Sequence, residues 1–387
     1  PEIEEFLFMR KSSGGDANRK CLNLHHGINI TDDFMTSVTK NIDWKLIDPH
    51  SKKVGKSINA RELWRLILET RHETGEPYLH FVDTSNKSLP ETQKKLGLSI
   101  KQSNLCSEIT LPTDEDRTAV CCLSSVNLAK YDEWSTSPTF IPDMVRMLDN
   151  VLEHFIQATY DFSYDYKGEV LDMKVKEGME GFTKAGYSAY RERSLGLGAM
   201  GFHTYLQKLN VPFEGPIATG QNLKMFKQIK ELANKTSMEL AEERGEAPDM
   251  EGTGMRNAHL LAVAPNATSS IICGGTSPSI EPIRANVFIH KTLNGSFQVR
   301  NRQLHNLLKQ KWNNSEELQK EYDSDYQHFK DKIWQSISEN TGSVKHLDFL
   351  TDLERDVFKT ADEIDQNWII EHASKRQEFI CQAQSVN

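Results

Sequence analysis

The chain has 387 residues, of which 37% are hydrophobic and 26% are charged, and its formal net charge is −9. This length can bury a large core, and this composition is typical of a soluble globular protein. The negative charge and the lack of a basic stripe argue against direct binding of duplex nucleic acid.

Targeting signals are also missing from the sequence. The most apolar run, residues 259–265, is far shorter than the ~20 residues of a membrane-spanning helix. The acidic start of the chain does not resemble a signal peptide, and six cysteines in this length form no secreted disulfide framework. We therefore expect a cytoplasmic protein with reduced thiols and no membrane partner.

The first third of the chain predicts a helix, a strand and a loop. The helix follows the N-cap Asn59 and ends near Gly75, with apolar residues at helical spacing between them. The apolar segment 78–82 predicts a strand, and the polar segment 84–103 predicts a loop that leads to Asn104.

A second helical region is predicted to begin at Pro142. Its apolar residues at helical spacing predict a core-facing stripe of Met144, Met147, Leu148, Val151, Leu152 and Phe155. Residues 165–186 are rich in glycine and lysine, and they predict irregular structure.

Helical patterns return at about residues 187–209 and 218–243. The apolar segment 260–264 then predicts a strand, and beyond residue 300 the chain is predicted to be helical and polar. Because strands alternate with helices along the chain, the predicted fold class is α/β.

The segment Asn104-Leu105-Cys106-Ser107-Glu108 carries an amide, a thiol and a carboxylate at alternate positions. In a strand or a tight loop these three side chains point to one side. A neighbouring carboxylate disfavours a thiolate, so Glu108 suits proton transfer with a bound hydroxyl better than activation of a nucleophile. The alternative is an ordinary core cysteine between two polar residues.

A second thiol, Cys121, follows fifteen residues after Cys106 and is adjacent to Cys122. Vicinal cysteines seldom form a disulfide with each other, so one thiol of this pair is available to reduce a substrate and to become oxidised. The alternative is one core thiol and one exposed thiol without a redox role.

The segment Pro265-Asn266-Ala267-Thr268-Ser269-Ser270 follows the predicted strand 260–264 and carries three hydroxyl groups. If a helix begins there, its first amides make an anion site that suits phosphate oxygens. The alternative is a plain Ser/Thr N-cap, and the local sequence does not decide between the two.

Two further patterns carry no ligand prediction. Gly196-Leu197-Gly198-Ala199-Met200-Gly201 matches a dinucleotide-binding pattern, but residues 189–194 before it are polar and helical rather than a strand. We therefore interpret its small residues as allowing close helix packing. Cys21, His25 and His26 have no second ligand pair at metal-site spacing, so we predict a structural turn and no metal site.

Together these motifs resemble the large, catalytic subunit of ribonucleotide reductase. The resemblance is carried by Ser103-Asn104-Leu105-Cys106-Ser107-Glu108-Ile109, Val120-Cys121-Cys122-Leu123-Ser124, Arg193-Ser194-Leu195-Gly196-Leu197-Gly198, residues 265–270 and Ser279-Ile280-Glu281-Pro282. It implies a ten-stranded α/β barrel with a central finger loop, here at about residues 100–112. Residues 1–387 would form a single catalytic domain segment, a partial barrel with its phosphate loop at about residues 265–270.

The resemblance implies a role for each matching residue. Cys106 would become the thiyl radical that removes the 3′ hydrogen of a ribonucleoside diphosphate, and Glu108 would take the 3′-hydroxyl proton. Asn104 would hydrogen-bond the substrate hydroxyls, and Cys121 would be one of two redox cysteines that reduce the 2′ position. Residues 265–270 would bind the diphosphate, although Ala267 stands where relatives can place an acidic residue.

The resemblance also implies partners and missing parts. The second redox cysteine, the effector loops and an ATP-binding cone would precede residue 1, and the radical-transfer tyrosines and a cysteine-bearing tail would follow Asn387. This segment would bind no cofactor itself and would be inactive alone. A metal-containing small subunit would supply the radical, a thioredoxin-like or glutaredoxin-like protein would supply electrons, and nucleoside triphosphate effectors would bind outside this segment.

Three alternatives remain open at this stage. An adenosylcobalamin-dependent reductase shares the finger loop and the redox cysteine. A non-catalytic fragment could complete a barrel for a partner chain. A dehydrogenase built on the glycine pattern at 196–201 is the most distant alternative.

Overall fold

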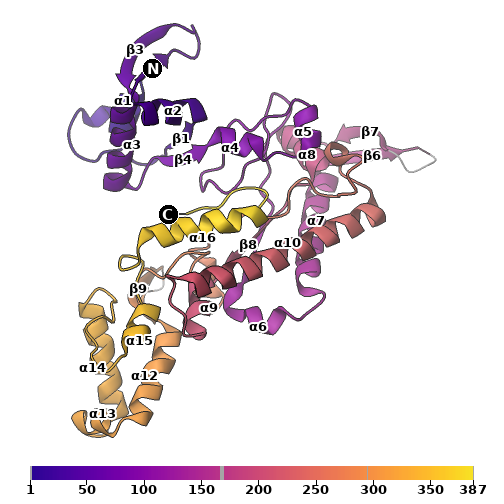
Figure 1. Ribbon diagram of the computed structural model, residues 1–387. Coiled ribbons are helices and arrows are strands. Elements are labelled where there is room, and N and C mark those ends of the chain that lie inside the picture. The colour runs from indigo at the N-terminus through magenta and orange to yellow at the C-terminus, as the bar shows by residue number, and fades with distance from the viewer. Residues whose placement is uncertain (1, 166–169, 294, 387) are drawn as a thin grey trace. The chain divides into compact units, whose positions relative to one another are not determined.

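The computed structural model describes residues 2–165, 170–293 and 295–386, and helices and strands alternate along it (Figure 1). The chain divides into two compact units. The first unit is formed by Pro1–Cys121, Phe155–Glu192 and Ala247–Thr253, and the second unit by Cys122–His154, Arg193–Glu246 and Gly254–Asn387. The α/β class predicted from the sequence is confirmed.

The first unit contains three strand pairs and short to medium helices. Its elements are α1 (Ile3–Phe8), β1 (Gly27–Ile30), α2 (Asp32–Lys40), β2 (Asp43–Ile47), β3 (Val54–Asn59), α3 (Ala60–Thr74), β4 (Tyr78–Phe81), α4 (Val82–Lys87), α5 (Glu91–Lys95), β6 (Tyr160–Tyr164), β7 (Val170–Val175) and α8 (Thr183–Glu192). Strand β1 pairs with β4 in parallel, whereas β2 pairs with β3 and β6 with β7 in antiparallel fashion.

Helix α3 confirms the predicted helix start and end. The Asn59 side chain accepts hydrogen bonds from the amides of Arg61 and Glu62, and Gly75 ends the helix in the left-handed region with φ of 78°. Strand β4 confirms the predicted strand at 78–82 apart from its last residue.

The loop predicted for residues 84–103 is wrong in part, because α4 and α5 lie within it. The Asn86 side chain links α4 to the following chain: its amide donates to Ile100 O at 2.9 Å and its oxygen accepts from Ile100 N at 2.8 Å. A one- or two-turn helix depends on such tertiary bonds rather than on a hydrophobic pattern.

The irregular structure predicted for residues 165–186 is also wrong in part. Strand β7 pairs with β6 from Tyr160 opposite Val175, and α8 begins at Thr183. Within this segment, residues 166–169 lie outside the described part of the chain. Pairing with β6 stabilises β7 although its own pattern is weak.

The second unit contains the remaining elements. They are β5 (Leu123–Asn127), α6 (Tyr131–Trp134), most of α7 (Phe140–Thr159), β8 (Gly196–Met200), α9 (Phe202–Lys208), α10 (Pro216–Arg244), α11 (Ser269–Ile272), β9 (Val287–Thr292), β10 (Gly295–Arg300), α12 (Arg302–Asn314), α13 (Glu316–Glu321), α14 (Tyr326–Glu339), α15 (Asp352–Val357) and α16 (Gln366–Arg376).

Four parallel segments form the centre of the second unit. Strand β5 pairs with β8, and β8 contacts the extended segment 260–263 through Leu197 N to Leu260 O at 2.8 Å. On its other side this segment bonds to residues 382–385, with Val263 N donating to Ala383 O at 3.1 Å. The strand predicted at 260–264 is therefore confirmed as extended backbone with isolated bridges. In the described residues the strands form two-stranded pairs, and no closed barrel is among them.

The helix predicted for residues 187–209 is wrong in part, because β8 separates two shorter helices, α8 and α9. A Cβ atom at Gly196 would lie 2.2 Å from the Leu123 side chain, and one at Gly198 would lie 2.5 Å from Ala262 O. These glycines allow neighbouring parallel segments to approach closely, so the small residues serve strand packing rather than helix packing.

Helix α7 begins at Phe140, and its buried face differs from the predicted stripe. Met147 and Val151 are 44% and 55% exposed. The buried face instead comprises Ile141, Val145, Leu148, Asp149, Leu152 and Ile156. The buried face thus shares Leu148 and Leu152 with the predicted stripe and includes the carboxylate of Asp149.

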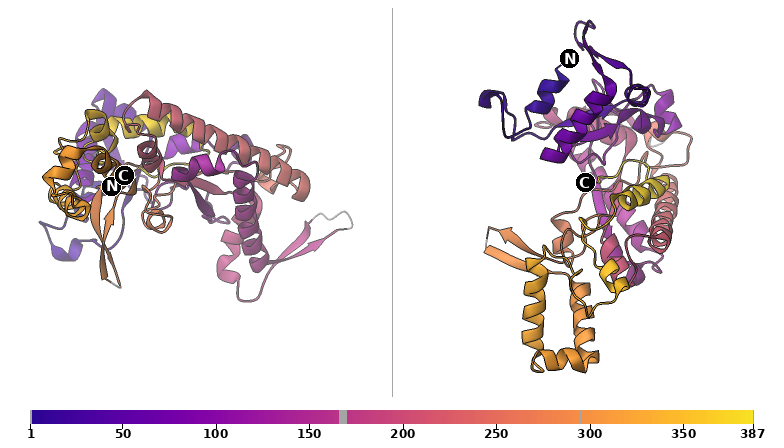
Figure 2. Two further views of the ribbon diagram at one scale, coloured as in Figure 1. Left: turned by 90° about the horizontal axis from the view of Figure 1, so that it is seen from below. Right: turned by 60° about the vertical axis from the view of Figure 1, so that its left-hand side comes forward.

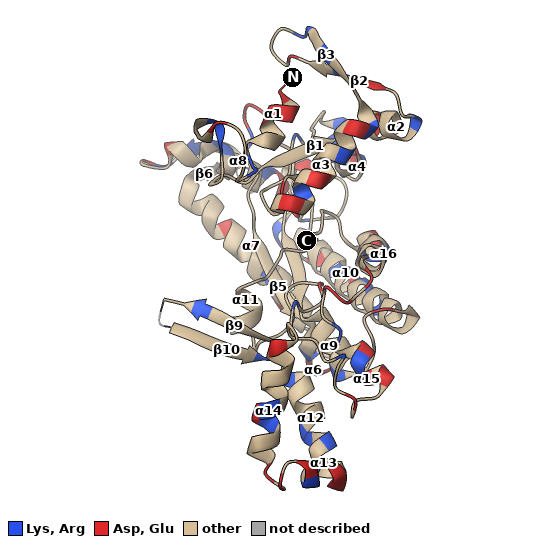
Figure 3. Cartoon of the chain, turned by 90° about the vertical axis from the view of Figure 1, so that its left-hand side faces the viewer, with Lys and Arg blue, Asp and Glu red and all other residues tan. Residues whose placement is uncertain are grey.

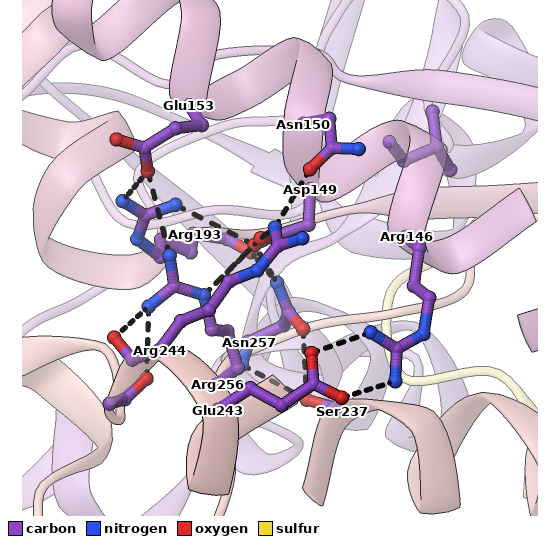
Figure 4. Close-up of polar contacts among 12 residues, drawn as sticks. Arg146, Asp149, Asn150, Glu153, Arg193, Ser237, Glu243, Arg244, Arg256 and Asn257 are labelled. Atoms are coloured by element: carbon purple, nitrogen blue, oxygen red, sulfur yellow. Dashed lines mark hydrogen bonds and ion pairs between the residues drawn. The ribbon is translucent and has the colours of Figure 1, made fainter. Parts of the chain in front are cut away.

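Asp149 is the centre of a buried ionic cluster (Figure 4). Its carboxylate lies 2.9 Å from Arg244 Nη1 and 3.3 Å from Arg256 Nε, and it accepts from Asn257 Nδ2 at 3.2 Å. Arg193 lies 3.6 Å from it, and the Arg193 carbonyl accepts from Asn257 Nδ2 at 2.9 Å. The cluster thus joins α7 and α10 to the residues that precede β8 and the segment 260–263.

Beyond residue 300 the chain is helical, as predicted. Helices α12 and α14 lie side by side and are joined by α13 (Figures 1 and 2), with Leu308, Trp312, Phe329 and Ile333 in their shared core. Acidic and basic residues are interspersed along α13 and α14 (Figure 3). Over residues 2–165, 170–293 and 295–386, no helix has both the length and the apolar character needed to cross a membrane.

Candidate active-site loop

The segment Asn104–Glu108 forms a tight loop in the first unit. Ser107 N donates to Asn104 O at 3.1 Å, and Ser107 has φ of 66°, a conformation that is uncommon for a residue with a side chain. The Asn104 amide donates to Glu108 Oε2 at 2.8 Å, and its oxygen accepts from Ile109 N at 3.0 Å. The predicted convergence of Asn104 and Glu108 is therefore observed.

The residues after the turn anchor this loop in the core. Glu108, Ile109, Thr110 and Leu111 are each at most 3% exposed, whereas Cys106 is only partly buried. A buried carboxylate needs hydrogen-bond partners, and the Asn104 amide is one of them. The loop thus presents a partly accessible thiol beside an anchored carboxylate.

Both predicted thiols are disfavoured as thiolates. Burial, and then the charge of Glu108, raise the pKa of Cys106. Burial also raises the pKa of Cys121, followed by the carboxylate of Glu108 and the neighbouring Cys106 thiol, although Cys121 is exposed as a residue. The same carboxylate therefore acts on both thiols, and both retain their S–H bonds at neutral pH.

The two vicinal cysteines differ in exposure. Cys121 is exposed, whereas Cys122 is 6% exposed and its sulfur lies 3.4 Å from Leu148 O. This arrangement makes Cys121 rather than Cys122 the accessible thiol of the pair.

Arg117, which precedes Cys121 in the chain, forms an ion pair that no sequence pattern indicated. Arg117 is 6% exposed and donates to both oxygens of Asp249, at 2.6 and 3.1 Å. Asp249 also accepts from Arg191 Nε at 2.8 Å, and the Arg117 guanidinium lies 5.5 Å from the Tyr187 ring centre. Arg117 and Asp249 are 132 residues apart, so no local pattern could predict this pair.

A pocket of about 240 Å³ adjoins the loop within the first unit, and it was also not predicted. Its lining includes Asn29, His80 and Asn104. His80 Nδ1 lies 2.9 Å from Asn29 Oδ1, and burial lowers the pKa of His80, so its imidazole is neutral at pH 7. The pocket therefore offers amide and imidazole groups beside the loop.

The predicted phosphate loop, residues 265–270, lies in the second unit. It follows the central segment 260–263 and leads into the single helical turn α11. Thr268 makes no side-chain capping bond, whereas Ser270 is 2% exposed and its hydroxyl donates to Ala267 O at 3.1 Å. The plain N-cap alternative therefore lacks its characteristic bond.

Asn266 fixes the start of this loop against the central strands. With its amide nitrogen directed inward, the side chain lies 3.1 Å from Ala264 O, 3.2 Å from Ala199 O and 3.1 Å from the Ser125 hydroxyl. These partners lie on or next to the parallel segments. Loops that follow parallel strands are common ligand sites in α/β proteins.

The Cys21–His26 region has other hydrogen-bond partners. His25 Nδ1 lies 2.5 Å from Glu76 Oε1, and the amide of His26 donates to Glu76 Oε2 at 2.9 Å. In the described parts of the chain, no group of three or more His, Cys, Asp or Glu side chains is arranged to hold a metal ion.

Comparison with known proteins now identifies the family. A family model described as the ribonucleotide reductase barrel domain matches residues 1–253 and 249–387. The chain belongs to this family. The resemblance inferred from the sequence is confirmed, and the α/β fold is of the ribonucleotide reductase type.

Comparisons with individual relatives point to the same family. The chain is 46% identical over its whole length to a putative ribonucleoside-diphosphate reductase large subunit of Frog virus 3, covering 62% of that protein. It is 41% identical to the corresponding large subunit of Invertebrate iridescent virus 3, covering 65% of it. A class Id ribonucleotide reductase alpha subunit of Actinobacillus ureae matches 99% of the chain with a TM-score of 0.78 and 34% identity, and 62% of that structure is covered. The chain thus spans somewhat less than two thirds of the length of these relatives.

Proposed function

We propose that this chain is the catalytic barrel part of a ribonucleoside-diphosphate reductase large subunit. The supporting observation is the loop in which Glu108, held by Asn104, lies beside a partly accessible and protonated Cys106. A hydrogen-atom donor must keep its S–H bond, and a carboxylate that opposes thiolate formation meets this need. The partial ten-stranded barrel and the single domain over residues 1–387 belong to the same proposal.

The proposed reaction uses these residues in sequence. Once a separate small subunit has generated a radical at Cys106, its sulfur removes the 3′ hydrogen of the ribose, forming an S–H bond and a carbon radical. Glu108 takes the 3′-hydroxyl proton, while the 2′ hydroxyl takes a proton from a redox thiol and leaves as water. After the reduction, the S–H bond of Cys106 returns its hydrogen to C3′. Asn104 orients the substrate hydroxyls, and residues 265–270 bind the diphosphate.

Electron supply involves Cys121. Two electrons are required, and we propose that Cys121 and a second cysteine outside this chain supply them by forming a disulfide. The exposure of Cys121 suits such exchange. A thioredoxin-like or glutaredoxin-like reductant would restore the thiols. Nucleoside triphosphate effectors would bind outside residues 1–387, and this chain would hold no cofactor itself.

The test is turnover of CDP to dCDP by a large subunit of full relative length that contains this chain, mixed with a small subunit. We expect Cys106→Ser to abolish turnover and Cys21→Ser to leave it unchanged, because Cys21 lies outside the loop. Equal turnover in the Cys106→Ser variant would leave the chain only a structural role in the subunit. Turnover that requires adenosylcobalamin instead of a small subunit would favour the cobalamin-dependent alternative, which the similarity to a class Id subunit does not support.

A further inference from the structure

Cys381 lies in an unusual hydrogen-bonding environment within the second unit. Its sulfur accepts from the backbone amides of both Leu260 and Leu261, at 3.1 and 3.2 Å. These distances are short for the large sulfur atom, since they fall in the range of N–H···O bonds, and two amide donors stabilise an anionic acceptor better than a neutral one. The two donors belong to the central segment that leads into residues 265–270.

His259, which immediately precedes these donors, is the second part of this environment. Its side chain is 2% exposed, yet neither ring nitrogen has a hydrogen-bond partner of standard geometry in the described part of the chain. A buried imidazole without such partners is uncommon, so its ring nitrogens remain available to a neighbouring group. The ring lies close enough to Cys381 to alter its titration.

Charge favours the thiolate here. Burial by itself would raise the pKa of Cys381, but the interactions with His259 and the positive charge of Lys230 outweigh it and lower the pKa to about 6. As a neutral thiol, Cys381 would instead donate toward Leu261 O, 3.5 Å away, which already accepts from Gln382 N at 3.1 Å. Cys381 is only partly buried as a residue.

We propose that Cys381 and His259 form a thiolate–imidazole pair that makes Cys381 a site of selective oxidation by hydroperoxides. The sulfur attacks one peroxide oxygen, so that an S–O bond forms and the O–O bond breaks. Sulfur is oxidised to a sulfenic acid and the peroxide is reduced to hydroxide, which takes a proton from the imidazolium and leaves as water. This site is separate from the proposed reductase chemistry and uses none of its residues.

Oxidation at this position would affect the central segment. A sulfenic acid no longer presents an anionic sulfur to the amides of Leu260 and Leu261, so those two hydrogen bonds weaken. The residues that follow include the loop 265–270. The site thus links thiol oxidation to the part of the chain that carries the proposed phosphate loop.

The test treats the whole chain with hydrogen peroxide and dimedone between pH 5 and pH 9 and measures labelling of each cysteine by mass spectrometry. We expect Cys381 to be labelled with a midpoint near pH 6. Labelling of the exposed Cys273 serves as the internal reference for reagent activity. A Cys381 midpoint above pH 8, or no labelling of Cys381 while Cys273 reacts, would overturn the proposal.

Two variants test the pairing. His259→Gln removes the imidazole, and we expect the midpoint to rise by at least ~1 pH unit, a roughly tenfold loss of thiolate below the midpoint. Lys230→Gln changes a partly exposed residue on α10 and should shift the midpoint less, in the same direction. If circular dichroism shows that the His259→Gln variant does not fold, the midpoint of the Lys230→Gln variant tests whether nearby positive charge favours the thiolate. An unchanged midpoint in every variant that folds would refute the pair.

Discussion

Replacing Asp149 with Asn removes the charge at the centre of the ionic cluster in Figure 4 while keeping the size of the side chain. The Asp149 side chain is fully buried, and Arg193 and Arg256 are 7% and 6% exposed. After the substitution these two guanidinium groups would retain only Glu153, which is 31% exposed, as a shared carboxylate. Buried cations would then lack a buried counter-charge.

The expected loss is about 3–5 kcal/mol, the usual cost of removing one partner from a buried ion pair. Burial and the neighbouring Arg193 lower the pKa of Arg256, because both disfavour its charged form. A loss of this size is a large fraction of the ~5–15 kcal/mol that stabilises a typical domain.

Urea denaturation followed by circular dichroism measures this loss, and hydrogen exchange at the amides of β8 assigns it to the second unit. Glu243→Gln is the matched control, since Glu243 pairs with Arg146 at 2.7 Å in the same region but is 48% exposed. Exposed ion pairs contribute little, so the control should unfold close to the parent chain. If Asp149→Asn unfolds at the same urea concentration as Glu243→Gln, the cluster does not stabilise the fold as argued.

Two further outcomes are expected. Gly198→Ala should destabilise the chain by ~1–3 kcal/mol, because the new Cβ would lie 2.5 Å from the backbone oxygen of Ala262. Gly220→Ala in α10 is the control, since no atom lies within 4 Å of its new Cβ, and it should not destabilise the chain in the same urea assay. Equal stability of both variants would contradict the packing of β8. Burial lowers the pKa of His203 from 6.5 to about 4. As the pH falls, the unfolded chain therefore binds a proton at this histidine before the folded chain does. The contribution of the neutral His203 to the free energy of unfolding is fully present above pH 6.5 and decreases by about 3 kcal/mol as the pH falls to 4. His203→Asn keeps an acceptor for the amide of Ile283, which bonds Nδ1 at 3.0 Å, and should reduce this pH dependence, whereas an unchanged slope would refute it.

The short-range features of this protein follow from its sequence. Asn59 and Gly75 define α3 because capping and left-handed φ are properties of individual residues and their immediate neighbours. The order of the motifs around Cys106 and Cys121 is enough to identify the family. The contact of Asn104 with Glu108 could also be predicted, since both residues belong to one five-residue turn.

Other features depend on partners far away in the chain. Residues 196–200 become a strand because β5 and the segment 260–263 lie on either side of them, and the absence of a side chain at Gly196 and Gly198 allows that spacing. The same holds for the bonds between Arg117 and Asp249, which join residues 132 positions apart. The burial of Asp149 on α7 likewise depends on the cations of Arg244 and Arg256, which are distant in the sequence.

Residue type and short-range spacing are therefore sufficient to predict the family, the helix caps and the order of the reactive residues. Three features required the folded chain: which segments form the central strands, which of Cys121 and Cys122 is accessible, and the position of Cys381 beside the amides of Leu260 and Leu261. Burial, close packing and charge pairing act between segments that are distant along the chain. A local sequence pattern cannot predict which distant segment will pack against it.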